Sequence, residues 1–121
     1  DLRLVLLAPA FGVYDTLSEQ IGDSELGEWK KVGIKTFHPL GWDEDVSIPW
    51  TFMEDARRLG WPEVNHRTVI LHGLLDDVVP IESSRVFMRS SPFVEIVEVD
   101  DGHRLGESLE LLRDLVSMVL D

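Results

Sequence analysis

The chain has 121 residues, 44% apolar and 28% charged, a composition ordinary for one globular domain. Basic residues number 11 against 23 acidic ones, and the formal charge of −12 argues against nucleic acid or an anionic membrane surface as a partner. The absence of cysteine excludes disulfides and cysteine-based metal sites, and we expect a cytoplasmic protein.

The first predicted element is a strand over residues 2–8, where a nearly continuous apolar run ends at Pro9. Such a run is typical of a strand buried on both faces, as in a parallel sheet. No apolar run approaches the ~20 residues of a membrane span. Because the sequence has no initiator Met and starts almost inside this strand, we expect a fragment. Its open sheet edge, residues 2–7, should pair with a missing N-terminal half or with a second copy.

The segment between the first and second strands predicts short helices and a hairpin. Helices are expected over residues 16–21 and 24–31, with Asp15 and Ser24 as N-caps. Strand-like pieces at 34–38 and 46–48 flank a turn-rich loop and predict a β-hairpin. Residues 49–59 predict a helix with proline in its first turn and glycine after its end. We treat residues 34–66 as an insertion into a single domain, 1–121.

The second half of the chain alternates strands and helices. Strands are expected at 68–72, fully buried, and at 94–99, where alternating polarity predicts a half-exposed strand. Helices are expected at 80–89 and, as a long amphipathic element, at 105–120. This order predicts an α/β fold whose mainly parallel sheet is flanked by helices.

Titratable residues follow two of the predicted strands. In open α/β sheets, functional groups gather in loops beyond the carboxyl ends of strands. One such loop carries Asp76 and Asp77, and the next carries His103. A carboxylate beside a histidine orients the imidazole and stabilises its protonated form. The serine on a G-x-S-x-G turn that would complete a nucleophilic site is absent from the sequence.

These two loops resemble a known family. His72-Gly73-x-x-Asp76-x-Val78-Val79-Pro80 and Asp101-Gly102-His103 are similar to the acid and histidine signatures of the α/β-hydrolase superfamily. Residues 4–10 look like the strand that follows the nucleophile helix in that fold. The resemblance covers the chain in order, and it is strongest over residues 68–105. It implies the C-terminal half of the fold, with Asp76 as the triad acid and His103 as the base.

The resemblance also implies a function for the whole protein. The parent would hydrolyse an ester, a thioester or a similar carbonyl substrate without a cofactor, and this chain alone would be inactive. The nucleophile, on an absent segment, would be serine, with cysteine or aspartate as alternatives. A protein of another class remains open: a short natural module that uses a truncated hydrolase fold for binding or interaction.

Several residues have alternative interpretations. Asp77 competes with Asp76 as the acid, and either could cap the following helix. Asp100 and Asp101 are expected to shape a turn. Together with His103, the four aspartates could instead hold Mg²⁺ or Ca²⁺. We expect a structural role for His72 and assign none to His38 or His66. Four tryptophans lie between the first two strands and predict either a packed subdomain or an apolar lid over the site: Trp29, Trp42, Trp50 and Trp61.

Overall fold

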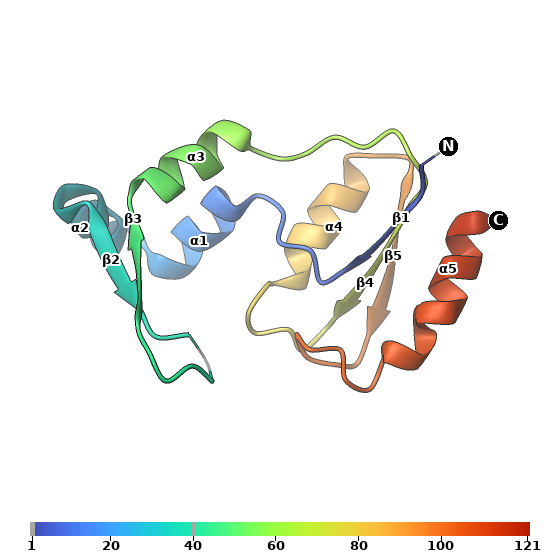
Figure 1. Ribbon diagram of the computed structural model, residues 1–121. Helices are drawn as coiled ribbons and strands as arrows, with labels where there is room; N and C mark the ends of the chain where they lie inside the picture. Colours follow the sequence, from blue (N-terminus) through green and yellow to red (C-terminus); the bar gives the residue numbers. More distant parts are fainter. Residues whose placement is uncertain (1, 40) are drawn as a thin grey trace. The chain divides into compact units, whose positions relative to one another are not determined.

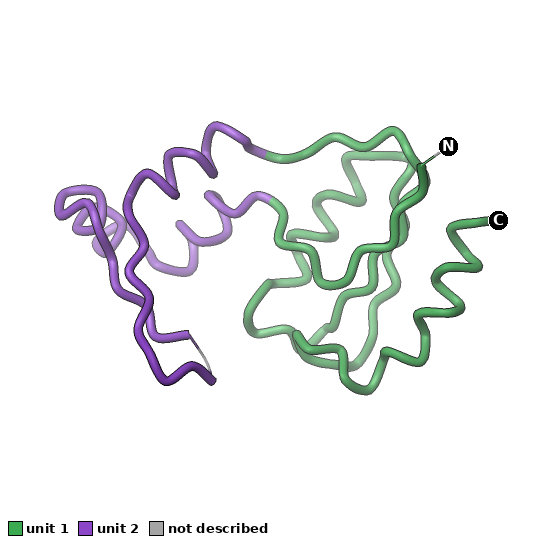
Figure 2. Tube along the Cα trace, viewed as in Figure 1, with its two compact units in different colours: residues 1–11, 61–121 green, residues 12–60 purple. Residues whose placement is uncertain are grey.

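The computed structural model describes residues 2–39 and 41–121. The chain divides into two compact units, coloured separately in Figure 2. One unit holds residues 1–11 and 61–121, and the other is Gly12–Gly60. Within the described residues, no helix is both long enough and apolar enough to cross a membrane.

The first unit contains a three-stranded parallel sheet. Its strands are β1 (Leu4–Leu7), β4 (Thr68–Gly73) and β5 (Val94–Val99), in the order β1-β4-β5. Leu4 lies opposite Thr68, and Thr68 lies opposite Val94, so all three strands start at the same edge. The predicted α/β class with a parallel sheet is confirmed. Among the residues described, no strand pairs with the outer side of β1.

Helices cover both faces of this sheet. Figure 1 shows α4 (Ile81–Arg89) on one face and α5 (Leu112–Leu120) on the other. Successive side chains of a strand point to opposite faces, so β4 contributes to two separate apolar clusters. Val69 packs in the cluster that α5 covers, and Ile70 packs against Phe87 of α4. Every residue of β4 is buried, as predicted for the central strand.

The C-terminal helix is shorter than the sequence predicts. The predicted helix over 105–120 was wrong at its start. Residues 105–108 are not helical, and a 3-10 turn, η1 (Leu109–Leu111), follows them before α5 begins. Leu105 has a φ of 53°, in the left-handed region that ends or prevents an α-helix. Its side chain is nevertheless buried in the α5 cluster, so tertiary packing holds this backbone conformation.

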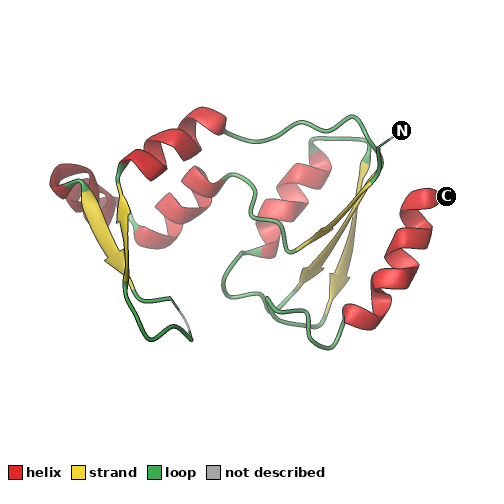
Figure 3. Ribbon diagram, viewed as in Figure 1, coloured by secondary structure: helices red, strands yellow, loops and turns green. Residues whose placement is uncertain are grey.

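Over its described residues, the second unit combines helices with a hairpin (Figure 3). The strands β2 (Ile34–Phe37) and β3 (Val46–Pro49) pair antiparallel, which confirms the predicted hairpin. The unit begins before residue 34 and ends before residue 66, so its bounds differ from those of the expected insertion. Its elements are α1 (Val13–Ile21), α2 (Asp23–Val32), β2 (Ile34–Phe37), β3 (Val46–Pro49) and α3 (Thr51–Leu59).

The expected N-caps of α1 and α2 were wrong. Asp15 and Ser24 lie inside the helices, and Gly12 and Gly22 occupy the cap positions. These two glycines have φ values of 56° and 86°. Glycine adopts such values without steric cost, so the chain can change direction at each of them, and each helix starts at the next residue.

Two tryptophans of the second unit, Trp29 and Trp50, pack against each other, whereas Trp42 is 60% exposed. Trp29 is buried, and its ring meets those of Phe37 and Trp50 edge-on at centroid distances of 5.6 and 5.4 Å. Its indole N–H donates to the carbonyl of Ile48 at 3.0 Å. Trp61 instead belongs to the first unit. A packed subdomain is thus present, whereas the lid role stays a prediction.

Candidate functional site

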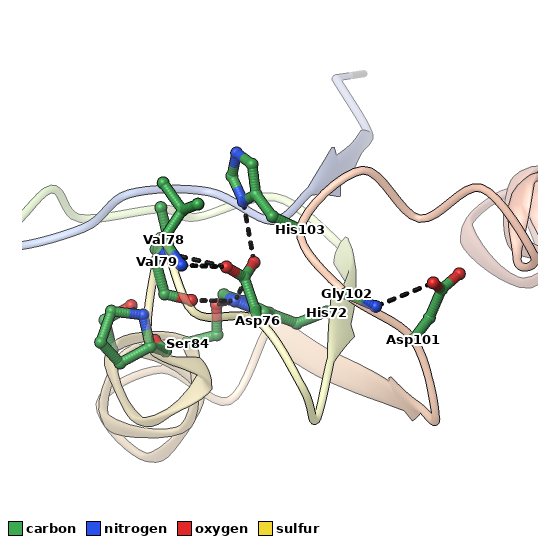
Figure 4. Close-up of polar contacts among 10 residues, drawn as sticks. His72, Asp76, Val78, Val79, Ser84, Asp101, Gly102 and His103 are labelled. Carbon is green, nitrogen blue, oxygen red and sulfur yellow. Dashed lines mark hydrogen bonds and ion pairs between the residues drawn. The ribbon is translucent and has the colours of Figure 1, made fainter. Parts of the chain in front are cut away.

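The loops after β4 and β5 meet at the carboxyl edge of the sheet. Nδ1 of His103 lies 2.9 Å from Oδ2 of Asp76, drawn as a dashed line in Figure 4. The two strands run parallel and in register up to Gly73 and Val99, which delivers both loops to one place. The predicted juxtaposition of histidine and carboxylate is confirmed, and Asp76 rather than Asp77 makes it.

The backbone of its own loop holds the Asp76 carboxylate. Oδ1 accepts hydrogen bonds from the N–H groups of Val78 at 3.0 Å and Val79 at 2.8 Å, while Oδ2 faces His103. Burial is the largest single influence and raises the pKa of Asp76. The hydrogen bonds from Val79, His103 and Val78 together outweigh burial and hold this pKa below its ordinary value of 3.8. Asp76 is therefore an ionised acceptor at neutral pH.

The contact with Asp76 determines where the proton of neutral His103 resides. A carboxylate only accepts, so Nδ1 of the imidazole carries the hydrogen and donates it. Nε2 of the neutral ring is then left with a lone pair, and Figure 4 shows it on the side of the ring away from Asp76. The His103 side chain keeps 37% of its surface exposed. This imidazole can accept a proton from a group that approaches Nε2.

Asp101 shapes the loop that carries His103. One of its oxygens accepts the N–H of Gly102 at 2.8 Å, and the other accepts the N–H of Glu107 at 3.0 Å and the hydroxyl of Ser108 at 2.8 Å. The Ser108 hydroxyl is the largest of the causes that lower the pKa of Asp101. The expected turn-forming role is confirmed, and the carboxylate closes the loop around His103.

Gly73 is a residue of the site to which the sequence reasoning gave no role. A Cβ atom at this position would lie 2.2 Å from the carbonyl oxygen of Asp101. Gly73 points to the same face of β4 as Leu71, and the chain leaving β5 crosses this face on its way to α5. The N–H of Leu75 donates to that same carbonyl of Asp101 at 3.0 Å, which ties the two loops together. A glycine directly after a buried strand was the available signal.

His72 has the structural role that was expected. Its side chain is fully buried, and Nδ1 lies 2.8 Å from the hydroxyl of Ser84 on α4. Nε2 lies 2.8 Å from the carbonyl oxygen of Val79 and 3.3 Å from Oδ2 of Asp76. His72 therefore holds the loop that carries Asp76 through its contact with the Val79 carbonyl (Figure 4).

The described residues of the first unit offer His103 no nucleophile. Their serine hydroxyls hydrogen-bond elsewhere: Ser83, Ser84, Ser90, Ser91, Ser108 and Ser117. The aspartates do not converge, because Asp76 faces its own loop and His103 while Asp101 faces residues 102–108. Across residues 2–39 and 41–121, no group of three or more acidic or histidine side chains could hold a metal ion.

Comparison with solved structures identifies the architecture. A protein from Agrobacterium vitis S4 named "putative hydrolase" superposes with a TM-score of 0.76 at 24% identity, over 98% of this chain and 49% of that protein. The chain has part of the α/β-hydrolase fold. Mouse alpha/beta hydrolase domain-containing protein 10 superposes on the chain with a TM-score of 0.74 at 20% identity, over 97% of this chain and 50% of the mouse protein.

The chain spans about half the length of each of these two proteins. No protein-family model and no curated protein sequence matches it. The superpositions therefore show the fold, over the part of it that this chain covers.

Proposed function

We propose that this chain is the acid–base half of an α/β-hydrolase that cleaves carbonyl substrates. One observation carries the proposal: Oδ2 of Asp76 accepts the Nδ1 proton of His103 at 2.9 Å, which leaves Nε2 available as a base. The nucleophile comes from a part of the parent protein outside these 121 residues. We favour serine, and cysteine or aspartate are the alternatives.

The chemistry of the dyad follows from its geometry. As the serine oxygen attacks the carbonyl carbon, Nε2 of His103 takes the hydroxyl proton and the ring becomes an imidazolium. The buried negative charge of Asp76 stabilises this cation and keeps the ring oriented. His103 then returns the proton to the leaving oxygen or sulfur, and the acyl-enzyme forms. Water repeats the sequence, releases the acid and restores the serine, so no cofactor is consumed.

The surface near the dyad supports an apolar acyl group as the substrate's acid part. Leu75 and Val78 lie within two residues of Asp76 in the sequence, and they are 65% and 50% exposed. Figure 4 shows Val78 on the same side of the loop as His103. Apolar side chains beside a catalytic pair favour esters or thioesters over strongly charged substrates, because charged groups lose hydration there. The proposed substrate class is an ester or thioester.

The outer side of β1 is the proposed docking edge. The N–H of Leu4 donates to the carbonyl of Arg67, directly before β4, and the N–H of Ala8 donates to that of Leu71, so alternation directs those of Val5 and Leu7 outward. Unpaired backbone groups on a sheet edge favour pairing with another strand. We propose that this edge pairs with the N-terminal half of the parent or with a second copy. A cytoplasmic location and a lid role for the second unit also stay proposals.

The experiment uses the gene product that carries residues 1–121. It should react with a fluorophosphonate probe and hydrolyse p-nitrophenyl esters, and both reactions should fall at least a thousandfold in His103→Ala, because the base is lost. His66→Ala, in the same unit, is the matched control and should keep full activity. The chain alone should give neither a burst nor turnover. Activity that survives in His103→Ala would contradict the proposal, whereas a wild-type gene product without any activity would favour a non-catalytic binding module.

A further inference from the structure

The buried imidazole of His72 lies directly behind the acid of the dyad. Alternation along β4 places His72 on the same face as Ile70, the face that α4 covers. Its side chain has no exposed surface. A fully buried imidazole needs partners for both ring nitrogens, since an unmet buried polar group is costly. Ser84 of α4 and Val79 of the acid loop provide them.

The partners of His72 determine its tautomer. The Val79 carbonyl only accepts, so Nε2 must carry the hydrogen and donate it at 2.8 Å. In the neutral ring Nδ1 is then an acceptor, and the Ser84 hydroxyl donates to it at 2.8 Å. A hydroxyl can donate or accept, so the Val79 carbonyl selects the Nε2–H tautomer, and Ser84 completes it by donating to Nδ1. The opposite tautomer would place a lone pair against the Val79 carbonyl.

This N–H acts on the same loop that holds the acid. The backbone of Val79 makes two hydrogen bonds here. Its carbonyl accepts from His72, and its N–H donates to Oδ1 of Asp76 at 2.8 Å. Nε2 of His72 also lies 3.3 Å from Oδ2 of Asp76, the oxygen that faces His103. The carboxylate oxygen therefore lies between two imidazoles, and helix α4 is linked to it through two side chains (Figure 4).

We propose that Ser84 and His72 are positioning residues that fix the orientation of Asp76 toward His103. The Ser84 hydroxyl holds the His72 ring at Nδ1, and the Nε2–H of His72 holds the carbonyl of Val79, the residue whose backbone N–H binds the carboxylate. The catalytic meaning of this arrangement rests on the proposed function. The arrangement itself can be measured without any turnover.

The test compares two neighbouring serines of one helix in the purified chain. Ser84→Ala removes the donor to His72, whereas Ser83→Ala removes a hydroxyl that donates to the Pro80 carbonyl instead. Histidine ¹⁵N spectra should show the Nε2–H tautomer of His72 in the wild type and in Ser83→Ala. In Ser84→Ala the Val79 carbonyl should keep the Nε2–H tautomer, but we expect a shifted Nδ1 resonance of His72, since its donor is lost, a broadened Nδ1–H signal for His103, and amide exchange at Val79 about tenfold faster.

A second pair of variants separates positioning from mere packing. In His72→Gln, the amide N–H₂ can still donate to Val79, so the His103 signal and the Val79 exchange should stay near wild type. His72→Leu keeps the apolar volume but has no donor, so both readouts should change. Urea unfolding of each variant measures global stability separately. Should His72→Leu fail to fold, the serine pair alone decides.

An unchanged Nδ1 resonance of His72 and an unchanged His103 signal in Ser84→Ala would overturn the positioning proposal, and so would equal effects in Ser83→Ala. In the active gene product, Ser84→Ala should lower kcat about tenfold with little change in KM. If the spectra change as expected but the gene product is inert toward esters, the positioning inference stands and the proposed function fails.

Discussion

Nδ1 of His103 and Oδ2 of Asp76 lie 2.9 Å apart although 27 residues separate them in the chain. The contact arises because β4 and β5 are adjacent parallel strands whose loops leave the same edge of the sheet. It combines a fully buried carboxylate with a partly exposed imidazole, at 0% and 37% side-chain exposure. Asp76 thus holds Nδ1 of His103 from the buried side, and Nε2 lies on the side of the ring away from Asp76.

Replacing the carboxylate by an amide should reverse the tautomer of His103. In Asp76→Asn the position of Oδ2 is available to an N–H₂ group, which cannot accept from Nδ1, so the neutral ring should move its proton to Nε2. Histidine ¹⁵N spectra distinguish the two tautomers. Asp77→Asn, an exposed neighbour, is the control and should leave His103 unchanged. A persistent Nδ1–H signal in Asp76→Asn would show that Asp76 does not select the tautomer.

Asp76 should make folding stability depend on pH in the acid range. Its pKa in the folded state lies below the ordinary 3.8, so the unfolded chain binds the proton more readily. The contribution of Asp76 to the free energy of unfolding is complete above the unfolded pKa and is lost as pH falls through the folded pKa. The stability difference between wild type and Asp76→Asn should therefore be about 1–3 kcal/mol at pH 7 and shrink on acidification. Urea titrations at several pH values measure it, and a constant difference would contradict the assignment.

Gly73→Ala should disturb the dyad from the other face of the strand. The added Cβ would lie 2.2 Å from the carbonyl oxygen of Asp101, so the His103 loop must move. We expect a loss of about 1–3 kcal/mol in unfolding free energy and a weakened His103–Asp76 contact. Gly106→Ala is the matched control, since nothing lies within 4 Å of its Cβ position. Urea unfolding checks the stability, and equal stabilities for the two variants would argue against the close approach.

Leu105 should show an inverted order of substitution effects. Its side chain is 3% exposed and its φ is 53°, so packing opposes backbone strain. Leu105→Ala should cost about 2–5 kcal/mol, because it leaves a cavity. Leu105→Gly also removes the strain, which is about 1–2 kcal/mol, and should be no less stable than the alanine variant. At Leu115 in α5 the usual order should hold, with glycine about 1 kcal/mol worse than alanine. Thermal or urea unfolding of the four variants decides.

The free edge of β1 should cause association of the isolated chain. The outward N–H groups of Val5 and Leu7 need partners, and Leu7 is also 43% exposed. Size exclusion with light scattering should show dimers or larger species that depend on concentration. Leu7→Pro removes one outward N–H and leaves the pairing with β4 intact, so it should shift the distribution toward monomer. A wild-type chain that stays monomeric at high concentration would contradict the proposed docking edge.

In the first unit, the strands β4 and β5 were the elements that the sequence predicted most accurately. The buried run at 68–72 and the alternating run at 94–99 became β4 and β5, because hydrophobic periodicity reports directly on burial. Their loops then placed Asp76 and His103 together, since parallel strands end at one edge. The hairpin β2–β3 followed from a turn-rich loop between two strand-like pieces.

The errors lie where local propensity competed with distant contacts. Residues 105–108 have a helical apolar pattern, but Asp101 binds Glu107 and Ser108 and the core holds Leu105 at positive φ, so no helix forms there. The N-caps of α1 and α2 were misassigned because glycine conformations won over side-chain capping. Neither competition is visible in a window of a few residues.

By itself, the sequence determined that the chain is α/β, that Asp76 and His103 follow successive strands, and that the G-x-S-x-G serine motif is absent. Those properties depend on composition, on period-2 and period-3.6 patterns, and on the order of elements along the chain. The tertiary structure decided which aspartate faces His103, why Gly73 is glycine, and how Ser84 and His72 support the acid. Such choices depend on distances of a few ångströms between residues far apart in sequence, and only packed side chains set those distances.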